Sequence, residues 1–468
     1  MSRFSLTYIG IFFLIISILS FFNILYSYYF NIFLNLNSYI YTLIISLIFG
    51  LIFLIKKKDV FKITIYSKIL TVIIGYLILP LIISLPYYFS IYNVSFLNSY
   101  FEAISGFTST GFTIFDNIRY IDESLILWRS SSQWVGGLYF LFSIVLLIDI
   151  FDNNLKKSVT NFLSFDTSET LKQSFKILFL YVALTFIIFL IFYFIDIRSF
   201  ISFNLAMSLI SSGGFLPADN LVGILNTNVK VIIFSITMLV SFFSIFLSYN
   251  LVFIRNKNIN FFQEDIYLLF YLIFIIVLFF LLFNVDYNFS SIFLSLTSSI
   301  SNIGISLDNA PQNLSFIFLI LVIIGGSFLS TSSGIRFLKL YSLFKFSVND
   351  LLSHSRPKNV FTNKNYFSDI NIKSSEVNKY FLTVLIFIIS LFILTMLLTI
   401  SGIEFETSFK LSILTLMNTV NSSMYGLSYF NFVDLQFITK LYLIIFMIIG
   451  RVELLTLLII LKKFLFKN

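Results

Sequence analysis

Four short segments rich in glycine, serine or asparagine interrupt the apolar stretches of this 468-residue chain. Polar backbone at membrane depth is tolerated only where it is buried in protein or lines a water-filled cavity. Backbone carbonyls can replace the hydration shell of a cation, and glycine adopts the positive φ angles that aim them. We therefore expect the four segments to form an ion-selectivity filter. Its expected residues are Thr110, Gly111 and Phe112, then Ser212, Gly213 and Gly214, then Asn302, Ile303 and Gly304, and finally Met424, Tyr425 and Gly426.

A fifth polar segment, between residues 325 and 334, interrupts another apolar stretch. Small residues are common where membrane helices touch, so a close helix contact is one interpretation. We favour a loop that lies across the pore beneath the filter and acts as a gate. Its small residues are Gly325, Gly326, Ser327, Ser330, Thr331, Ser332, Ser333 and Gly334.

Two arginines stand inside or beside apolar stretches, where a charge is costly and by default suggests a function. Arg451 is expected to face the cavity beneath the filter and to contact the gate loop; a structural ion pair with a neighbouring helix is the alternative. Glu453 is two positions away, and residues so spaced on a helix do not face each other. Arg129 is expected to brace the first filter segment, with Glu102 as its partner.

The composition indicates a polytopic membrane protein, because 58% of the residues are hydrophobic and only 11% are charged. No cysteine is present, which excludes disulfides and thiolate chemistry. An enzyme is not expected, since a serine nucleophile needs a base nearby and the one histidine, His354, follows the gate segment by some 20 residues.

The basic residues indicate topology. The net charge is +8, but lysine and arginine gather in short loops between apolar spans, the longest run extending from Arg336 to Lys379. This positive-inside bias predicts that both termini are cytoplasmic, and it explains the charge without a nucleic-acid partner.

The same pattern recurs four times after two N-terminal spans: a long span, a half-helix too short to cross the membrane, a polar segment and a returning span. The sequence thus predicts an all-α polytopic membrane protein with four tandem span–re-entrant helix–span repeats around a central pore. The expected units are an N-terminal extension at 1–67 and repeats at 68–160, 161–260, 261–365 (with a broken returning span) and 366–468. The half-helices are expected at 96–108, 200–211, 289–301 and 407–420.

Several of these stretches resemble the TrkH/KtrB superfamily of bacterial potassium transport subunits. They are SGFTSTGFT at 105–113, LWRSSSQWVGG at 127–137, GGF at 213–215, IGGSFLSTSSGIR at 324–336 and GRVELLTLL at 450–458. The two extra N-terminal spans resemble the TrkH branch. The resemblance implies a gated potassium uptake pathway in the bacterial inner membrane, usually a homodimer on a cytoplasmic TrkA-like ring of nucleotide-binding regulatory subunits. The nucleotide site is expected on that partner, because this chain has no Gly-x-Gly-x-x-Gly motif after a strand pattern.

The chain departs from the family in the fourth filter segment and in the gate. Residues 420–427 read VNSSMYGL where the family usually has a Gly-Pro-Gly-like run. Gly426 is aligned with the filter glycine because it precedes Gly450 by 24 residues, close to the 25 residues from Gly111 to Gly136. Leu329 and Ser333 replace gate glycines.

One functional alternative stays open, namely a secondary transporter that couples potassium to sodium or protons. Such coupling normally uses intramembrane acidic residues. Few are evident here, chiefly Glu453, so a channel-like pathway is favoured.

Overall fold

The computed structural model describes residues 3–55, 65–115, 117–151, 170–219, 221–245, 247, 260–282, 288–307, 310–355, 374–427 and 430–452. It is almost entirely helical, which confirms the expected all-α class. Within the described residues, seven helices are long and apolar enough to cross a membrane. Glu453, and the basic residues that lie in the gaps between these ranges, fall outside the described part of the chain.

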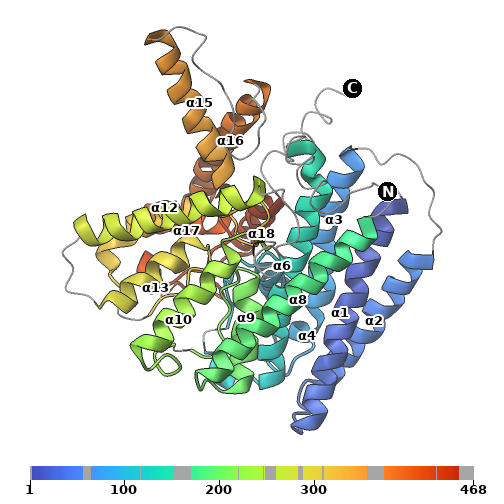
Figure 1. Ribbon diagram of the computed structural model, residues 1–468. Coiled ribbons are helices and arrows are strands. Elements are labelled where there is room, and N and C mark those ends of the chain that lie inside the picture. Colours follow the sequence, from blue (N-terminus) through green and yellow to red (C-terminus); the bar gives the residue numbers. More distant parts are fainter. Residues whose placement is uncertain are drawn as a thin grey trace.

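The first two helices form an antiparallel pair at one edge of the molecule (Figure 1). They are α1 (Arg3–Tyr29) and α2 (Leu36–Ile55). The inner face of α1 packs on α6, where Phe12 meets the ring of Tyr139 edge-on with centroids 4.8 Å apart. Tyr26 also donates to Glu123 at 2.6 Å. This pair is therefore docked on the core by both apolar and polar contacts.

The first repeat region consists of α3 (Ile65–Ile83), α4 (Leu85–Tyr88), α5 (Phe96–Phe107) and α6 (Glu123–Phe151). The helix is interrupted at Ser84, between Pro80 and Pro86, because a proline removes a backbone donor and clashes with the preceding turn. The short turn η1 (Ile118–Tyr120) lies in the loop before α6.

The second region begins with α8 (Thr170–Phe194) and α9 (Ser199–Ile210). The returning segment of this region starts with α10 (Asn228–Met238), which gives way to the turn η2 (Leu239–Ser241). The carbonyls of Ser241 and Phe242 instead accept the N–H groups of Ser332 and Ser327. The helix breaks where its backbone bonds to the segment at 325–334.

The third region contains α12 (Asn260–Leu282), α13 (Phe289–Ile300), the turn η3 (Gln312–Leu314) and α14 (Ser315–Ile323). The returning span is broken as expected. Strands β1 (Ile324–Gly325) and β2 (Ile335–Arg336) pair in parallel, with Ile324 opposite Ile335, and close the residues between them into a loop. The chain then continues as α15 (Phe337–Ser355), which projects from the body beside α16 (Figure 1).

The fourth region contains α16 (Ser374–Ile400), α17 (Phe405–Leu416), the turn η5 (Ser423–Tyr425) and α18 (Phe437–Val452). The half-helices α5, α9, α13 and α17 each have 12 residues, too short to cross a bilayer. Glycines on the returning helices let them pack closely: a Cβ on Gly136 would lie 2.0 Å from the Phe107 carbonyl oxygen, and one on Gly450 would lie 2.2 Å from that of Leu416.

Candidate ion pathway

All four half-helices end in the same turn. Two residues after each helix, the backbone adopts a left-handed conformation, at Ser109 (φ 57°), Ser212 (φ 57°), Asn302 (φ 58°) and Asn418 (φ 47°). The next backbone N–H then bonds back to the helix, as from Thr110 to Ser105 at 2.9 Å and from Thr419 to Leu414 at 2.9 Å. This is the Schellman geometry that satisfies the last helical carbonyls.

The residues two positions beyond these turns lie together although they are far apart in sequence. They are Gly111, Gly214, Gly304 and Val420. A Cβ on Gly111 would lie 3.0 Å from the Val420 side chain and 3.1 Å from the Gly214 Cα. A Cβ on Gly304 would lie 2.5 Å from the Val420 carbonyl oxygen. Three of the four expected filter segments therefore meet at their expected glycines.

The expected register of the fourth segment is wrong. Gly426 is exposed, and a Cβ added to it would meet only the Lys410 Nζ, at 3.3 Å. Met424 and Tyr425 are buried beside α13, where Tyr425 Oη donates to Ser299 Oγ at 3.4 Å. None of these three residues lies with the glycines.

A longer loop explains the error. Gly136 follows Phe107 by 29 residues, whereas Gly450, in the equivalent contact, follows Leu416 by 34. Counting back from Gly450 with the 25-residue spacing of the first repeat therefore stops short of the filter position, Val420. Counting forward from the end of each half-helix reaches Gly111 and Val420 at the same step.

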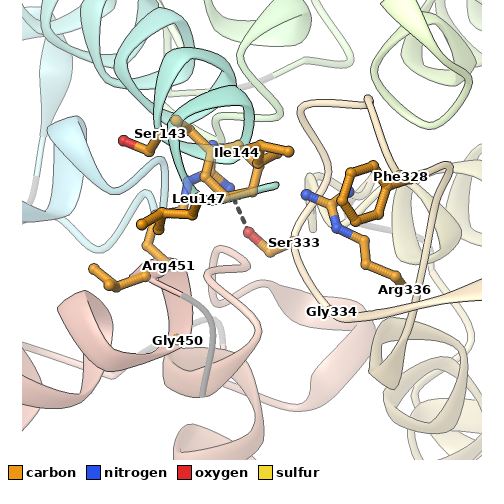
Figure 2. Close-up of a pocket in the computed structure, with 11 residues that line it drawn as sticks. Ser143, Ile144, Leu147, Phe328, Ser333, Gly334, Arg336, Gly450 and Arg451 are labelled. Carbon is orange, nitrogen blue, oxygen red and sulfur yellow. Dashed lines mark hydrogen bonds between the residues drawn. The ribbon is translucent and has the colours of Figure 1, made fainter. Parts of the chain in front are cut away.

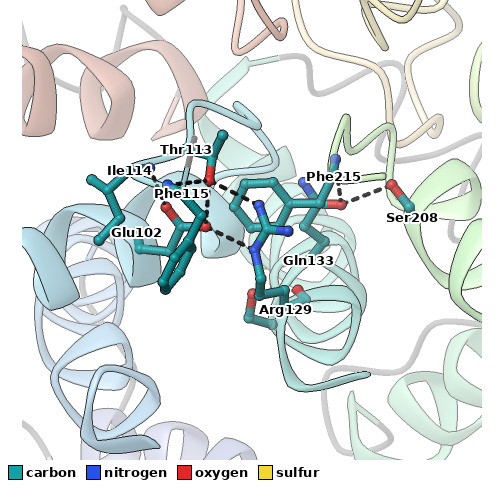
Figure 3. Close-up of polar contacts among 9 residues, drawn as sticks. Glu102, Thr113, Ile114, Phe115, Arg129, Gln133, Ser208 and Phe215 are labelled. Carbon is teal, nitrogen blue, oxygen red and sulfur yellow. Dashed lines mark hydrogen bonds and ion pairs between the residues drawn. The ribbon is translucent and has the colours of Figure 1, made fainter. Parts of the chain in front are cut away.

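Polar side chains hold the first two segments from behind (Figure 3). Glu102 and Arg129 form the expected ion pair at 2.9 Å, with both side chains buried. Glu102 also accepts the Ile114 N–H at 2.8 Å, and Arg129 donates to Thr113 Oγ1 at 2.9 Å. The Arg129 guanidinium lies 4.3 Å from the centroid of the Phe215 ring, which links the pair to the second segment.

Each of the other segments has its own anchor. Gln133 accepts from Ser208 Oγ at 2.8 Å and from the Phe215 N–H at 3.2 Å. Asn302 donates to the carbonyl of Val322 at 2.6 Å, and Asn418 donates to that of Met447 at 2.9 Å. The segments are thus tied to the helices α6, α14 and α18.

The residues between β1 and β2 pack under the ends of the half-helices, and we call 326–334 the plug loop. Thr331 Oγ1 donates to the carbonyl of Ile210, the last residue of α9, at 2.7 Å. Ser327 N–H donates to Phe242 and Ser332 N–H to Ser241, each at 3.0 Å. Position 325 has no room for a side chain, since a Cβ on Gly325 would lie 2.2 Å from the Ser333 carbonyl oxygen. The expected gate residues from Gly326 to Gly334 therefore lie together in one compact loop, and Gly325 is in the strand that closes it.

Arg451 lies between the plug loop and the filter segments, as expected. It donates to Ser333 Oγ, to Ser109 Oγ at 3.3 Å and to the Ser211 carbonyl at 3.4 Å. Its guanidinium also lies 3.9 Å from the centroid of the Phe140 ring. No carboxylate of the described residues pairs with Arg451 within salt-bridge distance. Figure 2 shows it beside the cavity that it lines with Phe328, Ser333 and Arg336.

The chain is similar to known transport proteins along most of its length. The profile of the TrkH family, described as a cation transport protein, matches residues 305–466. An uncharacterized cation transporter of Methanocaldococcus jannaschii is 24% identical over 80% of this chain and 78% of its own length. The Trk system potassium uptake protein TrkH of Salmonella typhimurium is 22% identical over 84% of each chain. The crystal structure of the potassium transporter TrkH from Vibrio parahaemolyticus superposes with a TM-score of 0.83 over 98% of both chains at 20% identity. The chain is therefore similar in sequence and in fold to the TrkH family of cation transport proteins.

This similarity agrees with the class of protein expected from the sequence. The relatives are described as transporters, not enzymes. Together with the seven apolar helices, they identify a multi-pass membrane protein. The crystal structure from Vibrio parahaemolyticus shows that the whole fold, including the two N-terminal helices, is that of a TrkH protein.

The structure also adds residues that sequence reasoning missed. Glu264, near the start of α12, accepts the Phe328 N–H at 3.1 Å and Ser327 Oγ at 3.3 Å, and thereby holds the plug loop. Arg336 was grouped with the cytoplasmic cationic run, but it is buried and donates to the Ser327 carbonyl at 2.9 Å. Both are charges at the edge of an apolar stretch, and that signal could have singled them out.

Proposed function

We propose that this protein conducts potassium across the cytoplasmic membrane through a gated pore. The main support is one observation: four separate parts of the chain meet at one place, through Gly111, Gly214, Gly304 and Val420. Four half-helices that end at a common point can present backbone carbonyls to a dehydrated cation. The potassium uptake relatives support potassium as the ion.

The plug loop and Arg451 form the gate in this proposal. The loop lies directly under the ends of the half-helices, and Arg451, which has no carboxylate partner among the described residues, places a positive charge there. A fixed cation in a narrow, poorly hydrated path repels a permeating cation strongly. Opening then requires that the loop and Arg451 move aside together.

A separate cytoplasmic partner would provide that movement. We propose a TrkA-like nucleotide-binding ring acting on a homodimer of this chain, with both termini on the cytoplasmic side. The projecting helix α15 supports this arrangement, because it connects directly through β2 to the plug loop. A partner that moves α15 can therefore act on the loop.

The test is ion uptake into liposomes that contain the purified protein. Rubidium uptake well above that of empty liposomes, reduced by competing potassium, is the expected result. Absence of protein-dependent uptake, also after replacement of residues 326–333 by a short Gly-Ser linker, would refute the proposed pore.

A secondary transporter is kept as a second candidate because of one observation. Glu264 and Asp265 are both buried on α12, and Glu264 touches the plug loop. Buried carboxyls in membrane segments are common proton or ion sites in transporters. Uptake driven uphill by an imposed proton or sodium gradient would favour this candidate over a channel.

A further inference from the structure

Val420 contacts all three of the other filter positions. A Cβ on Gly111 would lie 3.0 Å from the Val420 Cβ and Cγ2, and one on Gly214 would lie 2.5 Å from its Cβ and 2.8 Å from its Cγ1. The backbone of Val420 contacts the third segment, because its N–H donates to the Ile303 carbonyl at 3.4 Å. The isopropyl group therefore lies between the first two segments although it comes from the fourth.

In the proposed pore, a permeating ion must pass this position. The three glycines have no side chain, whereas the Val420 side chain lies against Gly111 and Gly214. Valine offers only C–H groups, so it cannot replace a water molecule in the shell of a cation, as a carbonyl does. The Ile303 carbonyl is also engaged by the Val420 N–H, which leaves it less available to an ion.

We propose that Val420 is the constriction that limits the rate and the size of the cations that pass the filter. This inference rests on the proposed pore and deepens it. An apolar constriction raises the barrier to a hydrated ion because the ion must lose water without compensation. Removing the side chain should lower that barrier.

The experiment compares variants of full-length protein in liposomes by rubidium and caesium uptake. Val420→Gly is expected to raise rubidium uptake by about tenfold, the change that corresponds to ~1.4 kcal/mol of barrier. Val420→Ala should be intermediate, and caesium uptake should rise more than rubidium uptake. Val420→Ile, which adds one methylene group, should lower uptake at least several-fold.

The matched control is Val222→Gly, at an exposed loop position, which should leave uptake unchanged. Uptake by Val420→Gly and by Val420→Ile equal to that of the unmodified protein would overturn the constriction. If Val420→Gly is not recovered as a monodisperse protein, the uptake rates of Val420→Ile and Val420→Ala test the constriction instead. If the proposed pore is wrong, the result is different: neither the Val420 variants nor the plug-loop replacement would then take up rubidium or caesium.

Discussion

At the scale of single residues, two buried arginines do different work. Arg129 is paired with Glu102 and braces the first filter segment from behind. Arg451 donates to neutral groups of the described residues, among them two serine hydroxyls and a carbonyl. A paired buried charge is chiefly structural, whereas in the proposed pore the positive charge of Arg451 would act on an ion that approaches it.

Replacing Arg129 should therefore destabilise the protein. Arg129→Gln leaves Glu102 buried without its partner, a loss that typically costs about 3–5 kcal/mol. We expect a clearly lower Tm of the detergent-purified protein. The matched control is Arg198→Gln, which breaks the exposed pair with Glu123, and such pairs contribute about 0–1 kcal/mol. Equal Tm values for the two variants would contradict the bracing role.

Replacing Arg451 should change flux more than stability. Arg451→Ala removes the positive charge beneath the filter, and rubidium uptake without a regulatory partner is expected to rise several-fold. Arg451→Lys keeps the charge and should stay close to the unmodified protein. If Arg451→Ala folds and its uptake is unchanged, the gating role is wrong; if it yields no folded protein, the residue is structural.

At the scale of elements, the half-helices are positioned by close backbone contacts with the long helices. Gly136 on α6 lies against the last residue of α5, and Gly450 on α18 lies against the last residue of α17. The plug loop is held just as tightly, by β1 pairing with β2 and by Glu264. Small shifts of α6, α18 or α12 are therefore transmitted to the filter segments or to the plug loop.

Gly136→Ala should disturb the filter. Its Cβ would lie 2.0 Å from the Phe107 carbonyl oxygen, so α5 or α6 must shift. Overpacking of this kind costs about 1–3 kcal/mol, and we expect both a lower Tm and reduced rubidium uptake. Gly223→Ala is the control, since a Cβ there meets nothing within 4 Å. A Gly136→Ala protein indistinguishable from that control would show that the contact is not critical.

Glu264→Ala should loosen the plug loop. Loss of the carboxylate leaves the Phe328 N–H without its acceptor, and basal rubidium uptake is expected to increase by a few fold. Glu406→Ala, which removes an exposed carboxylate paired with Lys410, serves as the control. Lower uptake with an unchanged Tm would instead point to Glu264 as an ion or proton site, the second candidate function.

At the scale of the whole molecule, the sequence predicted the order of helices and half-helices better than it predicted which residues of the fourth segment meet the other three. The lengths of the apolar stretches and the recurring polar segments were sufficient to predict where the half-helices lie, because both signals depend on local composition. The fourth filter position was missed because Val420 carries no glycine signal and the loop before α18 is longer than its counterpart. Gln133 and Glu264 were missed because their partners lie far away in sequence, and only the folded chain brings them together.

The two N-terminal helices should support this whole arrangement. Phe12 is fully buried and packs on Tyr139 and Phe142 of α6. Phe12→Ala is expected to cost about 3–5 kcal/mol, measured as a lower Tm. Phe22→Ala, on the exposed face of α1, should cost little in detergent. Similar Tm values for both would show that α1 is not part of the stabilising core.

The presence of one valine among three glycines has a consequence for symmetry. In a pore built from four identical subunits, any substitution at this ring would appear four times around one axis. With a Cβ on Gly214 only 2.5 Å from the Cβ of Val420, there is no room for a second valine. Because this ring is encoded at four separate places in one gene, a single position can change alone. A one-chain pore can thus acquire an asymmetric ring that a symmetric assembly could not accommodate.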